Sequence, residues 1–363
     1  MTDSWTIRRY RKGDEQAILQ LLNIVFSERL SLEYWKWKYQ NNPAGRSLIW
    51  LAECNSKIVG HYAIVPVTMK IGNVYVTGSL GSAAATHPNH QGEGVFSSIV
   101  NKCCVDAAEN DIPVTYGFSN TSLGPTYRRY ERMGRISFII RMMKVLDWQS
   151  VVATYAPSRL FSIAARALGR MTMSRCSSRD LSLEKINRFD DRFDALWEEI
   201  SHDFIVIAKR DKTYLNWRYI DHPSREHTVY AALEDSKILG YCVLAETRHQ
   251  NLELGLIVDI IGSLGRRNVV HRLIQVAVKH FEERGVDIVT CHLSERHPYQ
   301  GAFVSAGFIP HPHRKRALYC AINLRGSTID EKQAYSQALL LSQNQFLKKK
   351  SNWFMTLGDG DYP

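Results

Sequence analysis

Alternating runs of hydrophobic and polar residues predict two strand pairs that lie far apart in the chain. In each pair, two runs rich in β-branched and aromatic residues are joined by two or three polar residues, as a β-hairpin requires. The first pair covers residues 47–54 and 57–67, and the second covers residues 227–233 and 237–246. Each pair follows a short aromatic-rich segment that ends at a proline, which we interpret as a helix and a loop.

The two strand pairs belong to an internal repeat with a constant offset of 180 residues, as from Tyr34 to Tyr214. Five positions of the first helix and loop recur in the second at this spacing, and the two hairpins continue the match without a gap. The five are Tyr34, Trp37, Lys38, Tyr39 and Pro43, which correspond to Tyr214, Trp217, Arg218, Tyr219 and Pro223. Chance seldom keeps register over so many positions, so the sequence predicts a duplication.

Beyond the hairpins, both halves continue with alternating strands and helices. In the first half we expect a strand at 79–86, a helix at 95–110, a strand at 114–118, a short helix at 126–133 and a strand pair within 136–148. In the second half we expect a strand at 252–261, a helix at 269–284, a strand at 287–293 and a short helix at 299–306.

This pattern predicts an α/β fold of the mixed α+β kind, with two tandem domains. Each domain would contain a mixed, mostly antiparallel sheet flanked by helices. We place the first domain at residues 1–148, a linker with a basic amphipathic helix at 149–179, the second domain at 180–325 and a C-terminal tail at 326–363.

Composition and charge narrow the class of protein. A chain of 363 residues with 45% hydrophobic residues suits two ordinary globular domains. The net charge of +10 suits an anionic partner such as a nucleotide, RNA or a membrane surface. Seven cysteines, an odd number, argue against a disulfide framework. The cysteine content favours a reducing cytosol, so we expect a cytoplasmic protein. No run approaches the roughly 18 apolar residues of a membrane span, and the basic helix leaves peripheral membrane contact open.

A glycine-containing loop between a predicted strand and a predicted helix is the main candidate site. It covers residues 87–96 and contains Gln91, Gly92, Glu93 and Gly94. Glycines let the backbone approach a ligand closely, and a helix N-terminus offers N–H groups to an anion. A plain strand-to-helix connection is the alternative. Residues 262–267 stand at the equivalent place in the second half without this glycine spacing, so we expect no such site there.

The loop and the order of elements resemble the GNAT superfamily of acyl-CoA N-acyltransferases. In that family the loop reads Arg or Gln, two residues, Gly, one residue, then Gly or Ala, and it holds the pyrophosphate of coenzyme A. Gln91 and Gly94 match, whereas Phe96 replaces the small last residue. The resemblance implies acetyl-CoA as the acyl donor. The donor-binding residues that it implies are Thr86, Gln91, Gly92, Glu93, Gly94, Val95, Phe96, Ser119, Asn120 and Tyr127.

Acyl transfer from a thioester to an amine needs a base for the ammonium proton and an acid for the departing thiolate. The resemblance implies Tyr130 as the acid, with Tyr127 as an alternative; a tyrosine that only packs in the core is the competing interpretation. Glu53 is our candidate base. Three histidines of the first half are alternatives for that role: His61, His87 and His90. No histidine or cysteine has the paired spacing of a zinc site, so we expect no metal.

The sequence therefore predicts an acyl-CoA-dependent N-acetyltransferase whose second domain shapes the acceptor cleft. We expect the acceptor to be a small-molecule or glycan amine, such as an amino sugar or a cell-surface precursor. Two alternatives stay open. Tandem GNAT folds also resemble the bridge-building transferases that use aminoacyl-tRNA, and a basic chain can hold RNA. Both halves could instead form a non-catalytic binding scaffold.

Overall fold

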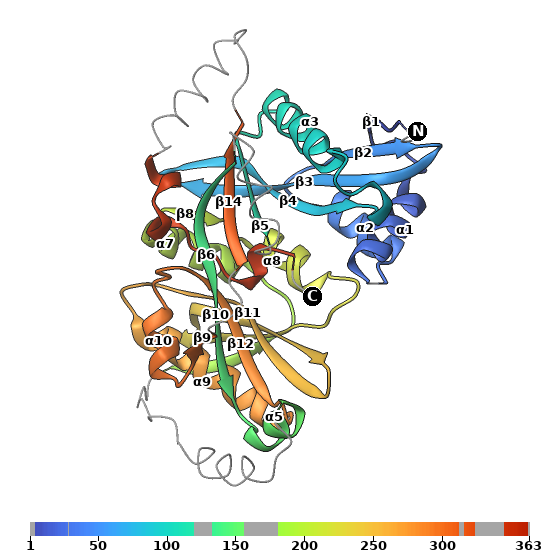
Figure 1. The fold of residues 1–363 in the computed structure, drawn as a ribbon. Coiled ribbons are helices and arrows are strands. Elements are labelled where there is room, and N and C mark those ends of the chain that lie inside the picture. The colour runs from blue at the N-terminus through green and yellow to red at the C-terminus, as the bar shows by residue number, and fades with distance from the viewer. Residues whose placement is uncertain are drawn as a thin grey trace.

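The computed structural model describes residues 4–27, 29–119, 133–155, 181–311, 316–323 and 345–361. These residues form two lobes that share one large mixed sheet, with helices packed on its faces (Figure 1). The strand order is β1-β2-β3-β4-β5-β14-β6-β12-β11-β10-β9-β7. The predicted mixed α/β class is confirmed. No helix in the described part of the chain is long and apolar enough to cross a membrane.

Lobe one contains the N-terminal strands and three helices. In chain order its elements are β1 (Thr6–Arg9), α1 (Glu15–Phe26), α2 (Leu32–Tyr39), β2 (Leu48–Cys54), β3 (Lys57–Ile71), β4 (Val74–Thr86), α3 (Val95–Glu109) and β5 (Val114–Ser119). The apolar stripe of α3 packs on β2 and β3. The helix lies so close that a Cβ atom on Gly60 would be 2.6 Å from Val95 Cγ1, which explains the glycine in the middle of a strand.

Lobe two has a similar order of elements, with additional strands and helices. It contains β7 (Ser182–Ile186), α7 (Asp191–Ile200), β8 (Val206–Ala208), α8 (Lys212–Leu215), the π-helical turn η4 (Asn216–Ile220), β9 (Thr228–Glu234), β10 (Lys237–His249), β11 (Leu252–Gly262), α9 (Arg267–Glu283), β12 (Ile288–Ser294), α10 (Gln300–Ser305) and β13 (Ile309–Pro310). One strand belongs spatially to the other lobe, because β8 pairs with β3.

The β2–β3 and β9–β10 hairpins have the same register. Trp50 faces Tyr62 in the first, and Tyr230 faces Cys242 in the second, so that both partners differ by 180 residues. Both turns consist of two residues with positive φ, at positions 55–56 and 235–236. Such left-handed turns match the twist of a two-residue hairpin.

Two strands cross between the lobes. β6 (Met133–Val145) comes from the first half of the chain and pairs with β12, while β14 (Arg316–Ile322) comes from the second half and lies between β5 and β6. In Figure 1, β6 in green runs beside β14 from one lobe to the other. The predicted strand pair within 136–148 is wrong: residues 133–145 form one strand, because they contain no Gly, Pro, Asn or Asp after Gly134 that would favour a hairpin turn, and α5 (Trp148–Tyr155) follows.

The C-terminal tail contains a buried segment rather than a solvated appendage. Trp353 packs in the core of lobe one, while Phe354 and Leu357 pack in the core of lobe two. The tail therefore passes between the lobes. The amphipathic helix predicted within 157–173 lies outside the described residues.

Candidate functional site

Two parallel strands of lobe one separate next to the start of α3. β4 and β5 pair only at Ser79–Thr115 and Leu80–Tyr116. Beyond these pairs β5 stays bonded to β14, and β4 stays bonded to β3 as far as Thr86. A gap therefore opens at the carboxyl ends of two parallel strands, which is where α/β sheets commonly bind ligands.

A bulge in β4 lies at this gap. Ala83 has a φ of 49°, and the pairs on either side leave Ala83 and Ala84 opposite Tyr62 alone. The His61 side chain secures the bulge, since its Nδ1 donates to the Ala83 carbonyl at 2.8 Å. Burial lowers the pKa of His61 to about 4, so the ring is neutral near pH 7. Its location among core residues makes it a support for the bulge rather than an exposed base.

The glycine loop leaves the first turn of α3 open. Gly94 is the N-cap residue with a φ of 83°, and no side chain caps the helix there. Gly92 has a φ of 87° and has no atom within 4 Å of the place where a Cβ would lie. Residues 91–94 are exposed. An uncapped helix N-terminus at the end of a gap between strands is a geometry that binds phosphate groups.

The other predicted donor residues lie around this loop. Gln91 donates to the carbonyl of Thr86, the last residue of β4, at 3.4 Å, and Glu93 contacts His90 at 3.0 Å. Val95 is buried against Gly60 and can offer a ligand only its backbone.

Two further predicted side chains flank the gap. Phe96 packs edge-on against Tyr62. Ser119 ends β5, and its Oγ is buried without a hydrogen-bond partner among the described residues. A buried hydroxyl of this kind can bond to a ligand amide. Asn120, Tyr127 and Tyr130 lie outside the described residues.

Glu53 does not lie at the gap, so our candidate base needs correction. It stands on β2, which β3 separates from β4, and its carboxylate accepts a hydrogen bond from Arg8 Nε at 2.5 Å. The sequence placed it near the active strands by its position in the hairpin, but the strand order puts it on the far side of β3. Its geometry is that of an ion pair fixing β1.

At β4 three residues meet that the sequence did not single out as site residues, namely Asp361, Ser82 and Lys38. Asp361, from the tail, accepts from Ser82 Oγ at 2.6 Å and from Lys38 Nζ at 2.7 Å. Arg218 is the counterpart of Lys38 in the repeat, and it donates to the carbonyls of Gly358 and Gly360 in the same tail. The sequence marks Lys38 and Arg218 as a repeated cation within the aromatic motif, but it carries no signal for their partners in the tail.

The equivalent loop of lobe two is closed. The Asp203 carboxylate accepts from the backbone N–H of Leu264 at 2.8 Å and from Ser263 Oγ at 2.9 Å. Arg266 forms an ion pair with Glu234 at 2.7 Å. A carboxylate thus already occupies the donors that would attract a phosphate.

The gap of lobe two is also filled. β11 and β12 pair from Leu254 to Ile257 and then separate. The tail lies in this space: a Cβ on Gly358 would be 2.2 Å from Tyr219 Oη and 3.4 Å from the Val258 carbonyl. These contacts give a physical basis for the expectation that the second half has no donor site.

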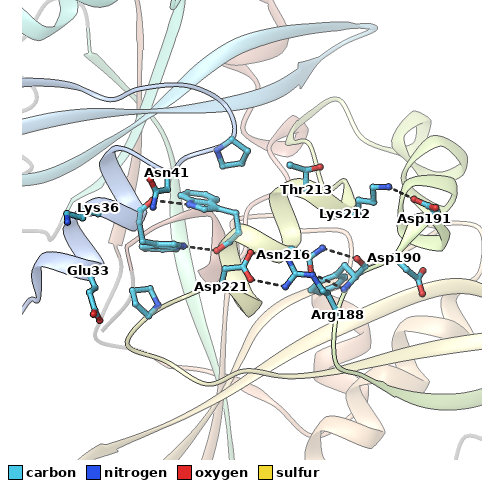
Figure 2. A pocket seen from close by; sticks show the side chains of 15 residues that line it. Glu33, Lys36, Asn41, Arg188, Asp190, Asp191, Lys212, Thr213, Asn216 and Asp221 are labelled. Atoms are coloured by element: carbon cyan, nitrogen blue, oxygen red, sulfur yellow. Dashed lines mark hydrogen bonds and ion pairs between the residues drawn. The ribbon is translucent and has the colours of Figure 1, made fainter.

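A groove of about 900 Å³ lies between the lobes. The rings of Trp37 and Trp217 stack 5.0 Å apart beside it, and each indole N–H donates to the other residue's carbonyl, at 2.8 and 3.0 Å. Figure 2 shows its charged rim, where Arg188 pairs with Asp221 and Lys212 pairs with Asp191.

The described residues contain no group of three or more His, Cys, Asp or Glu side chains that could hold a metal.

Comparison with known proteins identifies the fold of the chain and the family of a domain in its first half. Residues 6–132 match the acetyltransferase (GNAT) domain family. Saccharomyces cerevisiae N-myristoyltransferase with bound myristoyl-CoA is similar, with a TM-score of 0.66, 14% identity, and coverage of 90% of this chain and 84% of that chain. A GCN5-related N-acetyltransferase from Anabaena variabilis has a TM-score of 0.62 and 14% identity over 88% and 73% of the two chains. At these identities the structures show a shared fold alone. A sequence comparison with curated proteins gives no match.

The chain carries a GNAT domain in residues 6–132, as its sequence predicted, and as a whole it shares the two-lobe fold of these structures. It is an acyltransferase of the kind that uses an acyl-CoA donor and an amine acceptor.

Proposed function

We propose that this protein is an N-acetyltransferase that binds acetyl-CoA in lobe one. The observation that carries the proposal is the open N-terminus of α3, which stands at the end of the gap between β4 and β5. In this arrangement residues 91–96 hold the pyrophosphate through backbone N–H groups. The gap takes the pantetheine arm, and Ser119 Oγ bonds to one of its amides.

The space next to Phe118 argues against a long acyl chain at that place. The cavity next to Phe118 has a volume of about 10 Å³, and Ile139, Leu357 and Gly360 line it. This is roughly the room of one water molecule. N-myristoyltransferase, which is similar in fold, binds a long acyl chain. The close packing of the tail in the present chain favours acetyl instead.

The groove between the lobes is our proposed acceptor site. Helix α2 contributes Glu33, Lys36 and Trp37 to the groove. The next residue of the helix, Lys38, contacts Asp361 beside the β4 gap, so the groove and the gap lie next to the same helix. Glu33, Asp190 and Asp191 line the groove and attract an ammonium group, while the tryptophan and proline surfaces suit a sugar ring or a similar small body. An amine on a small molecule or a glycan fits this chemistry.

The charged rim of the groove argues against RNA, such as an aminoacyl-tRNA, as a ligand of this site. The charged residues that line the groove are three cations, Lys36, Arg188 and Lys212, and four carboxylates, Glu33, Asp190, Asp191 and Asp221, so it has no excess of positive charge for a phosphate backbone. We also propose that the chain is cytoplasmic and that its halves are copies of one unit. The common hairpin register and the paired roles of Lys38 and Arg218 support the duplication.

Titration calorimetry with coenzyme A, acetyl-CoA, octanoyl-CoA, myristoyl-CoA and tRNA tests the proposal. We expect one acetyl-CoA site per chain, with weaker binding of the long-chain thioesters. At about 100 times its dissociation constant, the ligand should raise the apparent free energy of unfolding by roughly 2.7 kcal/mol. Release of free thiol on adding a panel of amines then tests catalysis. Absence of binding by every acyl-CoA would overturn the assignment, and binding without turnover of any amine would favour the scaffold alternative.

A further inference from the structure

The C-terminal segment connects the gap of lobe two to the gap of lobe one. At its start, Phe354 donates to the Val206 carbonyl at 2.9 Å, and the Met355 carbonyl accepts from Ser294 at the end of β12 at 3.1 Å. Farther along, Tyr116 on β5 donates its hydroxyl to the Asp359 carbonyl at 3.0 Å. The segment thus leaves one pair of diverging strands and reaches the other.

A buried ionic cluster fixes the middle of this segment. The Arg210 guanidinium contacts Asp259 of β11 at 3.1 Å and Asp359 of the tail at 2.8 Å. All three side chains are at most 2% exposed. Thr356 adds a hydrogen bond to Asp259 at 2.9 Å. Because such groups are costly to bury unless all are paired, the path of the segment through lobe two is specified tightly.

The end of the segment is held by the two repeat-related cations. Arg218 binds the carbonyls of Gly358 and Gly360, and Lys38 binds the Asp361 carboxylate. The Lys38 side chain is buried, whereas Asp361 is partly exposed. Asp361 therefore supplies the counter-charge of a buried ammonium and still reaches the Ser82 hydroxyl with its second oxygen.

Ser82 directly precedes the bulge at the gap. The Ala83 carbonyl is held by His61 from one side, and the Ser82 side chain is held by Asp361 from the other. We propose that Asp361 is a positioning residue of the lobe-one acyl site, which acts through Ser82 on the β4 bulge and is delivered there by the tail lodged in lobe two. This inference rests on the proposed function. In this inference, the gap of lobe two binds the tail and thereby orients Asp361 toward lobe one.

The test compares Ser82→Ala and Asp361→Asn with the parent protein. Ser82→Ala removes one hydroxyl and leaves the Lys38–Asp361 ion pair intact, so it should fold even if the second variant does not. Asp235→Asn is a matched control, because Asp235 lies exposed in the turn of the second hairpin. The measurements are the dissociation constant of acetyl-CoA, kcat for its turnover, and Tm.

We expect both variants to lower kcat, by up to about 100-fold as misplacement of reacting groups can, while the acetyl-CoA dissociation constant stays near that of the parent. The control should behave as the parent does. Parent-like kcat in both variants, or a loss of binding and kcat that only follows Tm, would overturn the positioning role while the proposed function stands. If the parent binds no acyl-CoA, the proposed function fails, and the positioning role fails with it.

Discussion

Replacing Gly94 with valine tests donor binding most directly. Gly94 has a φ of 83°, where a residue with a Cβ atom costs about 1–2 kcal/mol. Packing adds little to this cost, since the nearest atom to a new Cβ would be Ser97 Oγ at 3.7 Å. The free energy of unfolding should therefore fall by only about 1–2 kcal/mol, and the variant should remain folded.

The effect on binding should be larger than this strain. The valine methyl groups would stand at the uncapped end of α3, in the space where the pyrophosphate binds in the proposed complex. Relief of the strained φ would also turn the next N–H group away from the ligand. A hydrogen bond to a charged group contributes about 1.5–3 kcal/mol. Loss of one such bond should weaken acetyl-CoA binding by roughly 10- to 150-fold.

Gly265→Val in lobe two is a control for the added side chain, although Gly265 lacks the positive φ of Gly94 and so does not reproduce its backbone strain. A Cβ there would also meet only a serine hydroxyl, Ser263 Oγ at 3.6 Å, but the Asp203 carboxylate already closes that loop. Calorimetry with acetyl-CoA should give a parent-like dissociation constant for this control. The reasoning is refuted if Gly94→Val binds acetyl-CoA as tightly as the parent, or if both variants lose affinity equally.

Three further predictions concern catalysis, the contact between the lobes and pH. Tyr130→Phe should lower kcat by about 10²–10⁴-fold with the acetyl-CoA dissociation constant unchanged; steady-state kinetics check this, and parent-like turnover would move the role to Tyr127 or to water. Trp37→Phe and Trp217→Phe each remove a buried N–H donor. Each should lower the free energy of unfolding, measured in urea, by about 1–3 kcal/mol. The double variant should lose less than the sum of the two single losses, and strict additivity would contradict coupling through the stacked rings. Burial lowers the pKa of His61 to about 4, so the folded state binds fewer protons than the unfolded state between about pH 6.5 and 4. The free energy of unfolding should fall as pH falls through that window, by about 3 kcal/mol from this residue, and urea titrations of His61→Gln should show a weaker pH dependence than the parent.

Local sequence signals were sufficient for the hairpins and the loop. Two local signals specify both hairpins: the strands alternate between apolar and polar residues, and turn residues stand between them at positions 55–56 and 235–236. The partners of β6 follow from no such signal, because the pattern within a strand does not specify which distant strands it pairs with. The exchange of β6 and β14 between the lobes is therefore a tertiary outcome that alternation alone does not predict.

The candidate site divides in the same way. Gly92 and Gly94 were predictable because their conformations serve a local turn before a helix. Glu53 was misplaced, since its distance from β4 depends on strand order rather than on position in a hairpin. The contact between Lys38 and Asp361 joins residues 323 positions apart, and no periodicity reports a contact over that distance.

The two lobes show how one fold can hold different occupants at equivalent places. Both have a pair of parallel strands that diverge before a helix, and both have a cation at the same position of the aromatic motif. In lobe two, an anion at the loop would meet the Asp203 carboxylate, and a ligand in the gap would have to displace a tail held by buried charges. In lobe one, the loop is exposed and Asp361 of the tail contacts Ser82 beside the point where the strands separate. The tail that fills one gap is thus the same element that borders the proposed donor site in the other, so both roles depend on its path between the lobes.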